Sequence, residues 1–258
     1  MAPYLSPTVA LAIAPLTAAA GGVKPALALA RRIGYEAAQL SAAQAGIRPR
    51  DLDGRGRRDL LAELARQSLA PAGLDLFIPH EHWGSPQHQD RAVAAVLAAL
   101  ELAAEMGRIP LSTTLPTEAA DDAMVGEIVS AADGRSTPIA LHAESDPDGL
   151  AALLSRHDTP VLGVGVDPAG VLAGGGEPGG FVLRFADRLL AARLDDYRAA
   201  SALRTPSRVA LGSGSLDLDE YRAALAAANR LQVLIADPRD LADPAAGAGR
   251  ALEVWREM

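Results

Sequence analysis

Several short apolar runs of this sequence end in residues whose side chains can ligate metals, move protons or bind polar ligands. These residues are His80, Glu81, His82, Trp83, His142, Glu144, Asp167, Arg193, Asp195, Asp196 and Asp237. Carboxylates are the preferred ligands of hard divalent cations, and imidazole suits softer ones. Both groups also serve as general acids and bases. The pattern predicts a polar site assembled from the ends of several segments.

Glu144 and Asp167 form the sharpest candidate pair. Glu144 alternates with His142 onto one face of an extended segment, and Asp167 ends the next apolar run. Two carboxylates at neighbouring strand ends could hold one divalent cation (Mn²⁺, Mg²⁺ or Zn²⁺). The alternative is that both are solvated loop acids next to Pro147 and Pro168, in which case no metal is bound.

The histidines fall into two groups. His80 and His82 flank Trp83 closely enough to predict a pocket for a sugar ring, although a polar loop covering the site would show the same residues. His142 lies within an apolar run, which favours a packed histidine that is hydrogen-bonded to a neighbour.

The elements that must position these residues are short apolar runs alternating with helical patterns. The expected strands are Thr8–Leu16, Tyr35–Leu40, Gly73–Ile78, Ile109–Leu115, Pro138–Ala143, Pro160–Val166, Leu189–Leu194 and Leu231–Ile235. The expected helices include Lys24–Ile33, Arg55–Gln67, Gln87–Met106, Asp146–Ser155, Asp217–Ala228 and Pro244–Glu257. The glycine-rich segment 174–180 is expected to be a flexible loop.

Such alternation implies right-handed βαβ crossovers and a parallel sheet. The length favours an α/β fold of the (β/α)8 TIM-barrel type, as a single domain over residues 1–258. A doubly wound sheet is the alternative, but Gly21 and Gly22 are a lone pair rather than a dinucleotide-binding fingerprint. In a barrel, the site lies at the carboxyl ends of the strands.

Composition excludes several classes of protein. The chain has 258 residues, no cysteine and a net charge of −8. The lack of cysteine excludes a disulfide scaffold, a thiol nucleophile and thiolate zinc. The acidic balance argues against nucleic acid or an anionic membrane as a partner. The apolar stretch from Val9 to Ala20 lacks a basic start and contains Pro15, so we expect a cytoplasmic protein without a membrane span.

Three segments together resemble a known family. Residues 211–217 (LGSGSLD) resemble a G-x-G-x-x-D turn before a late helix, residues 31–36 (RRIGYE) follow the first helix, and residues 165–168 (GVDP) end the sixth strand. With Glu144 at the fifth strand, this order is similar to that of the xylose isomerase-like TIM-barrel superfamily, the sugar phosphate isomerases/epimerases. The resemblance spans nearly the whole chain.

This resemblance implies one divalent metal held by Glu, Asp, His and Glu from strands five to eight. Carried over, Glu144 and Asp167 are the first two ligands. The histidine should fall within residues 190–193, which read LAAR, and the last glutamate at about Ala236. Asp237 is one position further, which turns a strand side chain to the opposite face. The resemblance therefore implies a degenerate metal site.

Two functions remain open at this stage. One is a sugar isomerase or epimerase that uses metal-assisted proton transfer, with Glu144, His80 and Asp237 as catalytic residues and His82, Trp83 and Arg193 binding substrate. The other is a catalytically degenerate barrel that binds a sugar-like ligand or a protein partner. A nuclease of the same superfamily is disfavoured, because the chain has neither histidine-rich metal positions nor a basic groove. Whether the chain is an enzyme, and whether it forms oligomers, the sequence leaves open.

Overall fold

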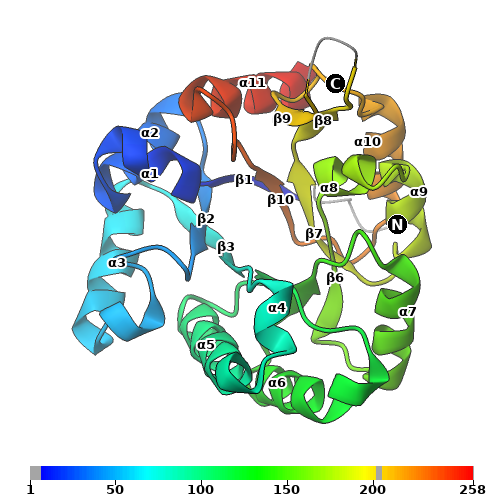
Figure 1. Ribbon diagram of the computed structural model, residues 1–258. Coiled ribbons are helices and arrows are strands. Elements are labelled where there is room, and N and C mark those ends of the chain that lie inside the picture. The colour runs from blue at the N-terminus through cyan, green and yellow to red at the C-terminus, as the bar shows by residue number, and fades with distance from the viewer. Residues whose placement is uncertain (1–6, 202–204, 258) are drawn as a thin grey trace.

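The parallel strands of this protein close into a barrel. The structure is a computed structural model that describes residues 7–201 and 205–257. Its barrel strands are β1 (Thr8–Ala12), β2 (Ala37–Ser41), β3 (Ala70–Leu76), β4 (Leu111–Thr113), β5 (Ile139–Leu141), β6 (Leu162–Val166), β7 (Leu189–Leu194) and β10 (Val233–Ala236). The closed order is β1-β10-β7-β6-β5-β4-β3-β2, with the helices outside the ring (Figure 1). The predicted TIM barrel is confirmed; residues 1–6, 202–204 and 258 of the predicted domain lie outside the described part.

Helices connect successive strands on the outside of the barrel. They are α1 (Ala14–Ala20), α2 (Val23–Ile33), α3 (Gly54–Arg66), α4 (His80–Trp83), α5 (Pro86–Glu105), α6 (Asp122–Arg135), α7 (Pro147–Arg156), α8 (Pro168–Ala173), α9 (Pro178–Arg184), α10 (Leu218–Ala226) and α11 (Pro244–Glu257), with short 3₁₀ turns at Pro49–Asp51 and Ala119–Asp121. The expected first strand is too long, since the chain turns into α1 soon after Ala12. Pro15 lies in the first turn of α1, where the fixed φ of proline suits a helix start.

The glycine-rich segment after β6 is more ordered than the sequence predicts. Pro178 opens α9, so the expected flexible loop is limited to the residues between α8 and α9. Gly179 is on α9, where a Cβ would lie 2.6 Å from Oε1 of Glu220 on α10. The glycine at this position therefore allows the two helices to approach closely.

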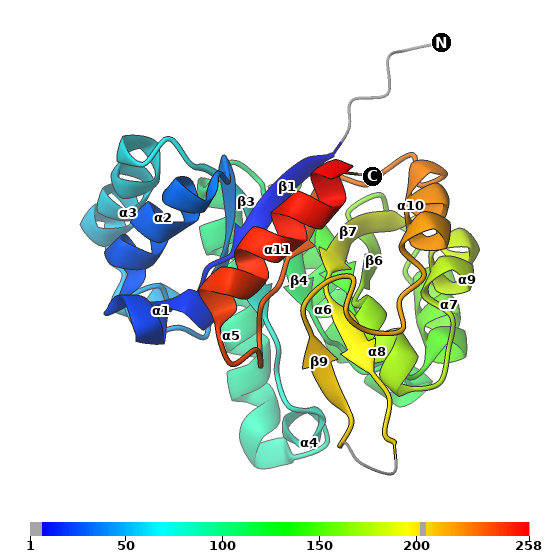
Figure 2. The same cartoon turned by 90° about the horizontal axis from the view of Figure 1, so that it is seen from above.

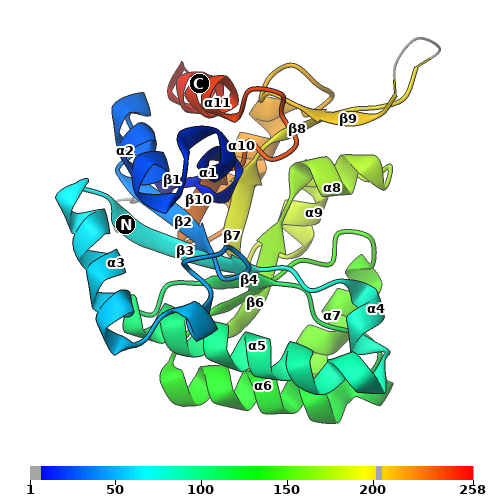
Figure 3. The same cartoon turned by 60° about the vertical axis from the view of Figure 1, so that its left-hand side comes forward.

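A two-stranded antiparallel hairpin, which the sequence analysis did not anticipate, follows β7. It consists of β8 (Asp196–Arg198) and β9 (Ser207–Val209). In Figure 2, β9 and α4 project from the same end of the barrel, and Figure 3 shows the hairpin extending away from the ring. The Asp196 carboxylate accepts hydrogen bonds from the backbone N–H groups of Gly214 and Leu216, which ties the base of the hairpin to the 211–217 turn.

The apolar core has an outer and an inner part. The outer part packs the strands against the helices and includes Leu11, Leu194 and Ala236. The inner part is enclosed by the strands and consists mainly of small residues: Ala10, Ala12, Ala37, Ala140, Leu190, Ala191, Val233 and Ile235. Small inward side chains leave room for larger polar ones near the end of the barrel. At Gly165 the fit is closest, because a Cβ there would lie 2.2 Å from Nε2 of His142.

No helix within residues 7–201 and 205–257 is both long and apolar enough to cross a membrane.

Candidate functional site

The strand register decides which polar side chains face the barrel mouth, the opening at the carboxyl ends of the strands. Arg193 of β7 is in register with Ile235 of β10, whose side chain belongs to the inner core. Because strand side chains alternate, Asp237 lies on the same inward side as Ile235, and Ala236 faces the helices. The expectation that Ala236 occupies the inward position and Asp237 the opposite face is therefore wrong by one residue.

Arg193 is the centre of one charged cluster in the mouth. Its side chain is 0% exposed, and its Nη1 donates a hydrogen bond to Oδ2 of Asp237. Its Nη2 lies 3.9 Å from Oδ2 of Asp75, and Arg239 holds Asp237 from the other side at 2.6 Å. Burial alone lowers the pKa of Arg193, but Asp237 and Asp75 more than offset it and raise the pKa, so the guanidinium stays charged.

A second charged cluster joins the β8–β9 hairpin to the barrel. Arg208 of β9 donates from Nη2 to Oδ2 of Asp167 at 2.5 Å and from Nη1 to Oδ2 of Asp195. Burial raises the pKa of Asp167, yet hydrogen bonds from Arg208 and its charge outweigh burial and hold that pKa well below its usual range. Burial, together with the nearby charge of Asp167, raises the pKa of Asp195 well above its usual value.

The structure brings the predicted pair Glu144 and Asp167 together. The backbone N–H of Asp167 donates to Oε1 of Glu144 at 2.8 Å. The same Oε1 is 2.8 Å from Nδ1 of His142, which is buried, as the sequence predicts for this histidine. Oδ1 of Asp167 also accepts the N–H of Gly170 at 3.0 Å and caps α8.

These contacts test whether the residues fit the divalent cation that the sequence suggests. Both oxygens of Asp167 accept from Arg208, and Oε1 of Glu144 contacts two nitrogen atoms. In the described ranges, no set of three or more histidine, cysteine, aspartate or glutamate side chains is placed to hold a metal ion. In this arrangement the donor set does not fit a metal, because arginine nitrogens occupy the positions next to the carboxylates.

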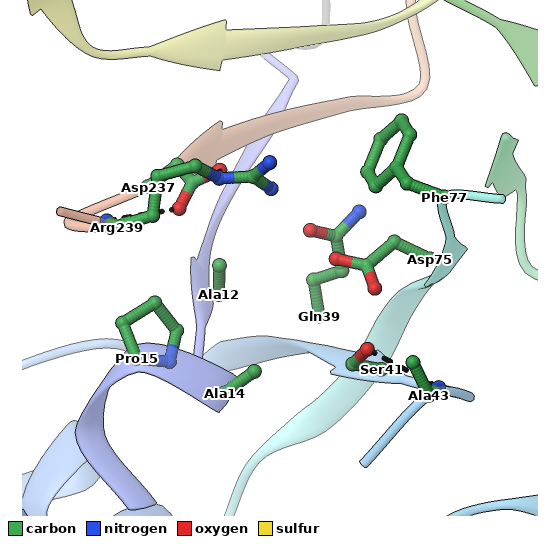
Figure 4. Close-up of a pocket in the computed structure, with 10 residues that line it drawn as sticks. All are labelled: Ala12, Ala14, Pro15, Gln39, Ser41, Ala43, Asp75, Phe77, Asp237 and Arg239. Atoms are coloured by element: carbon green, nitrogen blue, oxygen red, sulfur yellow. Dashed lines mark hydrogen bonds and ion pairs between the residues drawn. The ribbon is translucent and has the colours of Figure 1, made fainter. Parts of the chain in front are cut away.

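A pocket of about 270 Å³ opens beside the Arg193 cluster. It is lined by Ala12, Ala14, Pro15, Gln39, Ser41, Ala43, Asp75, Phe77, Asp237 and Arg239 (Figure 4). Gln39 is 1% exposed, and neither its amide nitrogen nor its amide oxygen has a hydrogen-bond partner. Its amide points into the space bordered by Asp75, Phe77 and Arg239 (Figure 4). A buried amide without partners carries unused hydrogen-bonding capacity, which a ligand can satisfy.

Asp75 is the carboxylate of this pocket with the fewest close partners. It is 7% exposed, and burial raises its pKa, opposed by the charge of Arg193 and a hydrogen bond from Ser41. The guanidinium carbons of Arg193 and Arg239 each lie 5.3 Å from the centroid of Phe77, so the ring of this lining residue contacts two cations.

A second pocket of about 290 Å³ is lined by one predicted catalytic residue and one predicted substrate-binding residue. His80 and Trp83 both line it, together with His142. Trp83 is buried, and its indole nitrogen has no hydrogen-bond partner. His82 is not among the lining residues; its ring lies 4.9 Å from that of His88, centroid to centroid, in a tilted arrangement. Of the candidate residues after β3, His80 and Trp83 therefore line the second pocket, whereas His82 contacts His88 of α5.

Sequence reasoning missed Gln39, Asp75 and Arg208. Gln39 and Asp75 each interrupt an apolar strand, in AAQLS and GLDLF, and a polar residue at an inward strand position is a signal that could have been used. Arg208 has no comparable local signal, because it reaches the site from a hairpin outside the barrel.

Comparison with known proteins agrees with the architecture. Residues 27–258 match the model of a family described as xylose isomerase-like TIM barrel. A search of curated proteins returns no match.

Solved structures of similar fold cover most of the chain. A xylose isomerase domain protein from Planctomyces limnophilus has a TM-score of 0.76 and 16% identity, covering 90% of this chain and 91% of that one. A xylose isomerase-like TIM barrel protein from Mycobacterium smegmatis, in complex with magnesium, has a TM-score of 0.74 and 13% identity, covering 92% and 88%. D-allulose 3-epimerase from Methylomonas sp., in complex with D-allulose, has a TM-score of 0.71 and 16% identity, covering 97% and 96%. At these identities the likeness is one of fold.

Proposed function

Since this chain belongs to the xylose isomerase-like TIM barrel family, we propose that it binds a small, uncharged, sugar-like molecule in the pocket around Gln39 and Asp75. The observation that carries the proposal is the buried amide of Gln39, whose donor and acceptor both lack a partner. A hydroxyl group can donate to the amide oxygen and accept from the amide nitrogen, so a polyol satisfies both atoms.

The charges of the pocket favour an uncharged ligand. Asp75 and Asp237 are balanced by Arg193 and Arg239, and Asp237 already contacts both guanidinium groups. A phosphate group would bring a double negative charge next to Asp75, where the two nearby guanidinium groups already face two carboxylates. The volume of about 270 Å³ lies just below the range of roughly 300–1,000 Å³ that is common for drug-sized ligands, which suits a molecule of monosaccharide size.

We propose further that this binding needs no divalent metal at Glu144 and Asp167. Both carboxylates accept hydrogen bonds from this chain's own groups. The reading of the chain as a barrel with a degenerate metal site is therefore favoured over metal-assisted catalysis.

Ligand-detected NMR with D-allulose, other free sugars and their phosphate esters tests this proposal. We expect saturation transfer to at least one free sugar, a weaker signal for its phosphate ester, and loss of binding in Gln39→Leu. Gln44→Leu is the matched control, because Gln44 also has an unpartnered amide oxygen but does not line the pocket. Equal binding by Gln39→Leu and the parent chain would refute the proposed pocket.

A second candidate function, sugar isomerisation or epimerisation, is favoured by Asp75. A carboxyl group with a raised pKa is a stronger base once ionised, and Asp75 borders the pocket directly. It removes a proton from the carbon next to a sugar carbonyl while the amide N–H groups of Gln39, which also lines the pocket, stabilise the oxygen that gains negative charge. Glu144 does not line this pocket, so Asp75 takes the role of base that the sequence assigns to Glu144.

Deuterium exchange reports such proton transfer even when the product is unknown. Incubation of free ketoses with the protein in deuterium oxide should label the carbon next to the carbonyl, as followed by NMR. Labelling that Asp75→Asn abolishes and Glu144→Gln retains would support catalysis by Asp75. Binding without any labelling would leave the protein a binding barrel, and labelling abolished by Glu144→Gln alone would reverse the assignment.

A further inference from the structure

We infer that Arg208 is a tethered cation of the barrel mouth, which pairs with both Asp167 and Asp195 and occupies the position next to these carboxylates that a divalent cation would need. This inference does not depend on the sugar pocket, because Arg208 is not among the residues that line it. It concerns the opposite side of the mouth, where β6 and β7 end.

The geometry brings two carboxylates to one nitrogen atom. Nη1 of Arg208 donates to Oδ1 of Asp167 at 3.1 Å and also to Oδ2 of Asp195. Nη2 donates to the other oxygen of Asp167 at 2.5 Å. Oxygens that share one donor converge on one point, which is the geometric requirement for a shared cation. Planar guanidinium suits this role because it binds carboxylates in a forked, two-point manner.

The surrounding charges explain why a cation is needed at this point. Asp167 and Asp195 are both buried, so their mutual repulsion is poorly screened by water. Arg193, whose guanidinium is fully buried nearby, donates to Asp237 rather than to either of them. The remaining oxygen of Asp195 accepts only the backbone N–H of Ala169, at 3.3 Å. Arg208 is therefore the side-chain cation that holds this pair.

Unlike a bound metal ion, the guanidinium of Arg208 is covalently part of the chain. Arg208 is carried on β9, in register with Tyr197 of β8, and not on a barrel strand. Its removal would leave the barrel strands in place and free Oδ2 of Asp167 and Oδ2 of Asp195, while Oδ1 of Asp167 would still accept the N–H of Gly170. Glu144 lies next to them, since it accepts the N–H of Asp167. Loss of Arg208 should therefore convert the pair into a site for Mn²⁺, whose preferred ligands are carboxylate oxygens.

Titration of free Mn²⁺, followed by electron paramagnetic resonance, tests the inference on the full chain. We expect the parent protein to leave Mn²⁺ free, Arg208→Ala to bind about one Mn²⁺ per chain, and Arg208→Ala combined with Asp167→Asn to lose that binding. The matched control is Arg198→Ala, which removes another arginine of the same hairpin whose guanidinium donates to the backbone oxygen of Ser213. It should behave like the parent protein.

Two results obtained with folded protein would overturn the inference. One is stoichiometric Mn²⁺ binding by the parent protein that Asp167→Asn abolishes, since the metal and Arg208 would then not exclude one another. The other is folded Arg208→Ala that binds no Mn²⁺. If Arg208→Ala folds only with Mn²⁺ present, the metal has replaced the guanidinium as inferred. If it fails to fold even with Mn²⁺, while Arg208→Lys folds, the site needs a side-chain cation that a metal cannot replace, and the inference is wrong.

Discussion

The two sides of the barrel mouth treat their polar groups in opposite ways. Where β6, β7 and β10 end, Asp167, Asp195 and Asp237 each accept from an arginine nitrogen. Where β2 and β3 end, the amide of Gln39 has no partner, and Asp75 has its nearest cation only at 3.9 Å. On the first side each of these carboxylates is paired with an arginine, although Nε and Nη2 of Arg193 have no hydrogen-bond partner among the described residues. On the second side the Gln39 amide has neither its donor nor its acceptor paired, which is the basis of the proposed binding. Polar groups of similar burial thus serve different purposes, according to whether the fold itself completes their hydrogen bonds.

The reach of arginine explains the asymmetry. Arg193 projects inward from β7, and Arg208 returns to the barrel from the hairpin that follows β7. Both start on the same side of the ring. The pocket beside β2 and β3 has one arginine among its lining residues, Arg239, and that side chain is bound to Asp237. Among the described residues, none donates to the amide oxygen of Gln39 or accepts from its amide nitrogen.

The largest expected loss of stability comes from removing Arg193, the fully buried arginine on the side where β6, β7 and β10 end. Arg193→Met removes a fully buried cation and leaves Asp237 and Asp75 short of positive charge. Removal of one partner from a buried ion pair costs about 3–5 kcal/mol, so we expect a loss of unfolding free energy of that size. Urea unfolding followed by circular dichroism measures it.

A double variant provides the control for this prediction. Arg193→Met combined with Asp237→Asn should recover part of the loss, because the unpaired carboxylate is then absent. Equal stability of Arg193→Met and the parent protein would show that the Arg193 pairs contribute nothing, and that the two sides of the mouth do not differ in the way described.

An intermediate effect is expected at Asp167, and it should depend on pH. The pKa of Asp167 is lowered in the folded protein, so its ionised form adds stability above the ordinary aspartate pKa of about 3.9. That stability is lost as the pH falls through the folded pKa. Asp167→Asn should therefore cost about 1–3 kcal/mol at pH 7, and the cost should shrink at strongly acidic pH.

Unfolding of the parent and variant proteins across a pH series measures this difference. Asp148→Asn is the comparison, because Asp148 pairs with Arg184 on the surface and such pairs are worth about 0–1 kcal/mol. A cost for Asp167→Asn that stays constant down to acid pH would contradict the assignment of its stability to the ionised carboxylate.

The smallest change in stability is expected at Gln39, on the side where β2 and β3 end. Gln39→Leu removes a buried amide that has no partner and therefore removes a desolvation penalty of about 1–3 kcal/mol. We expect the unfolding free energy to change by less than about 1 kcal/mol or to rise, although sugar binding is lost. A destabilisation as large as that of Arg193→Met would mean that the fold needs the Gln39 amide, and the contrast between the two sides would fail.

Much of the barrel could be predicted from local patterns. The alternation of apolar runs with helical periods placed β6 and β7 within a few residues, because each run must be buried as one strand. The period of two placed His142 and Glu144 on one face, and the structure joins them at 2.8 Å. Glu144 and Asp167 meet because they follow β5 and β6, which are neighbours in the barrel and run parallel. The hairpin of β8 and β9 escaped prediction, because its short strands carry no continuous apolar run.

Local sequence patterns predicted the barrel, the end of the barrel at which the candidate residues gather and the absence of thiol chemistry. These follow from local periodicity, strand direction and composition, which need no knowledge of distant contacts. The tertiary structure alone decided that Asp237 faces inward, that Gln39 and Asp75 border a pocket, and that arginines hold the carboxylates. Arg193 and Asp237 are 44 residues apart in the chain, and Arg208 and Asp167 are 41 apart. Pairing over such separations depends on barrel closure and on the reach of a long side chain, neither of which leaves a local pattern in the sequence.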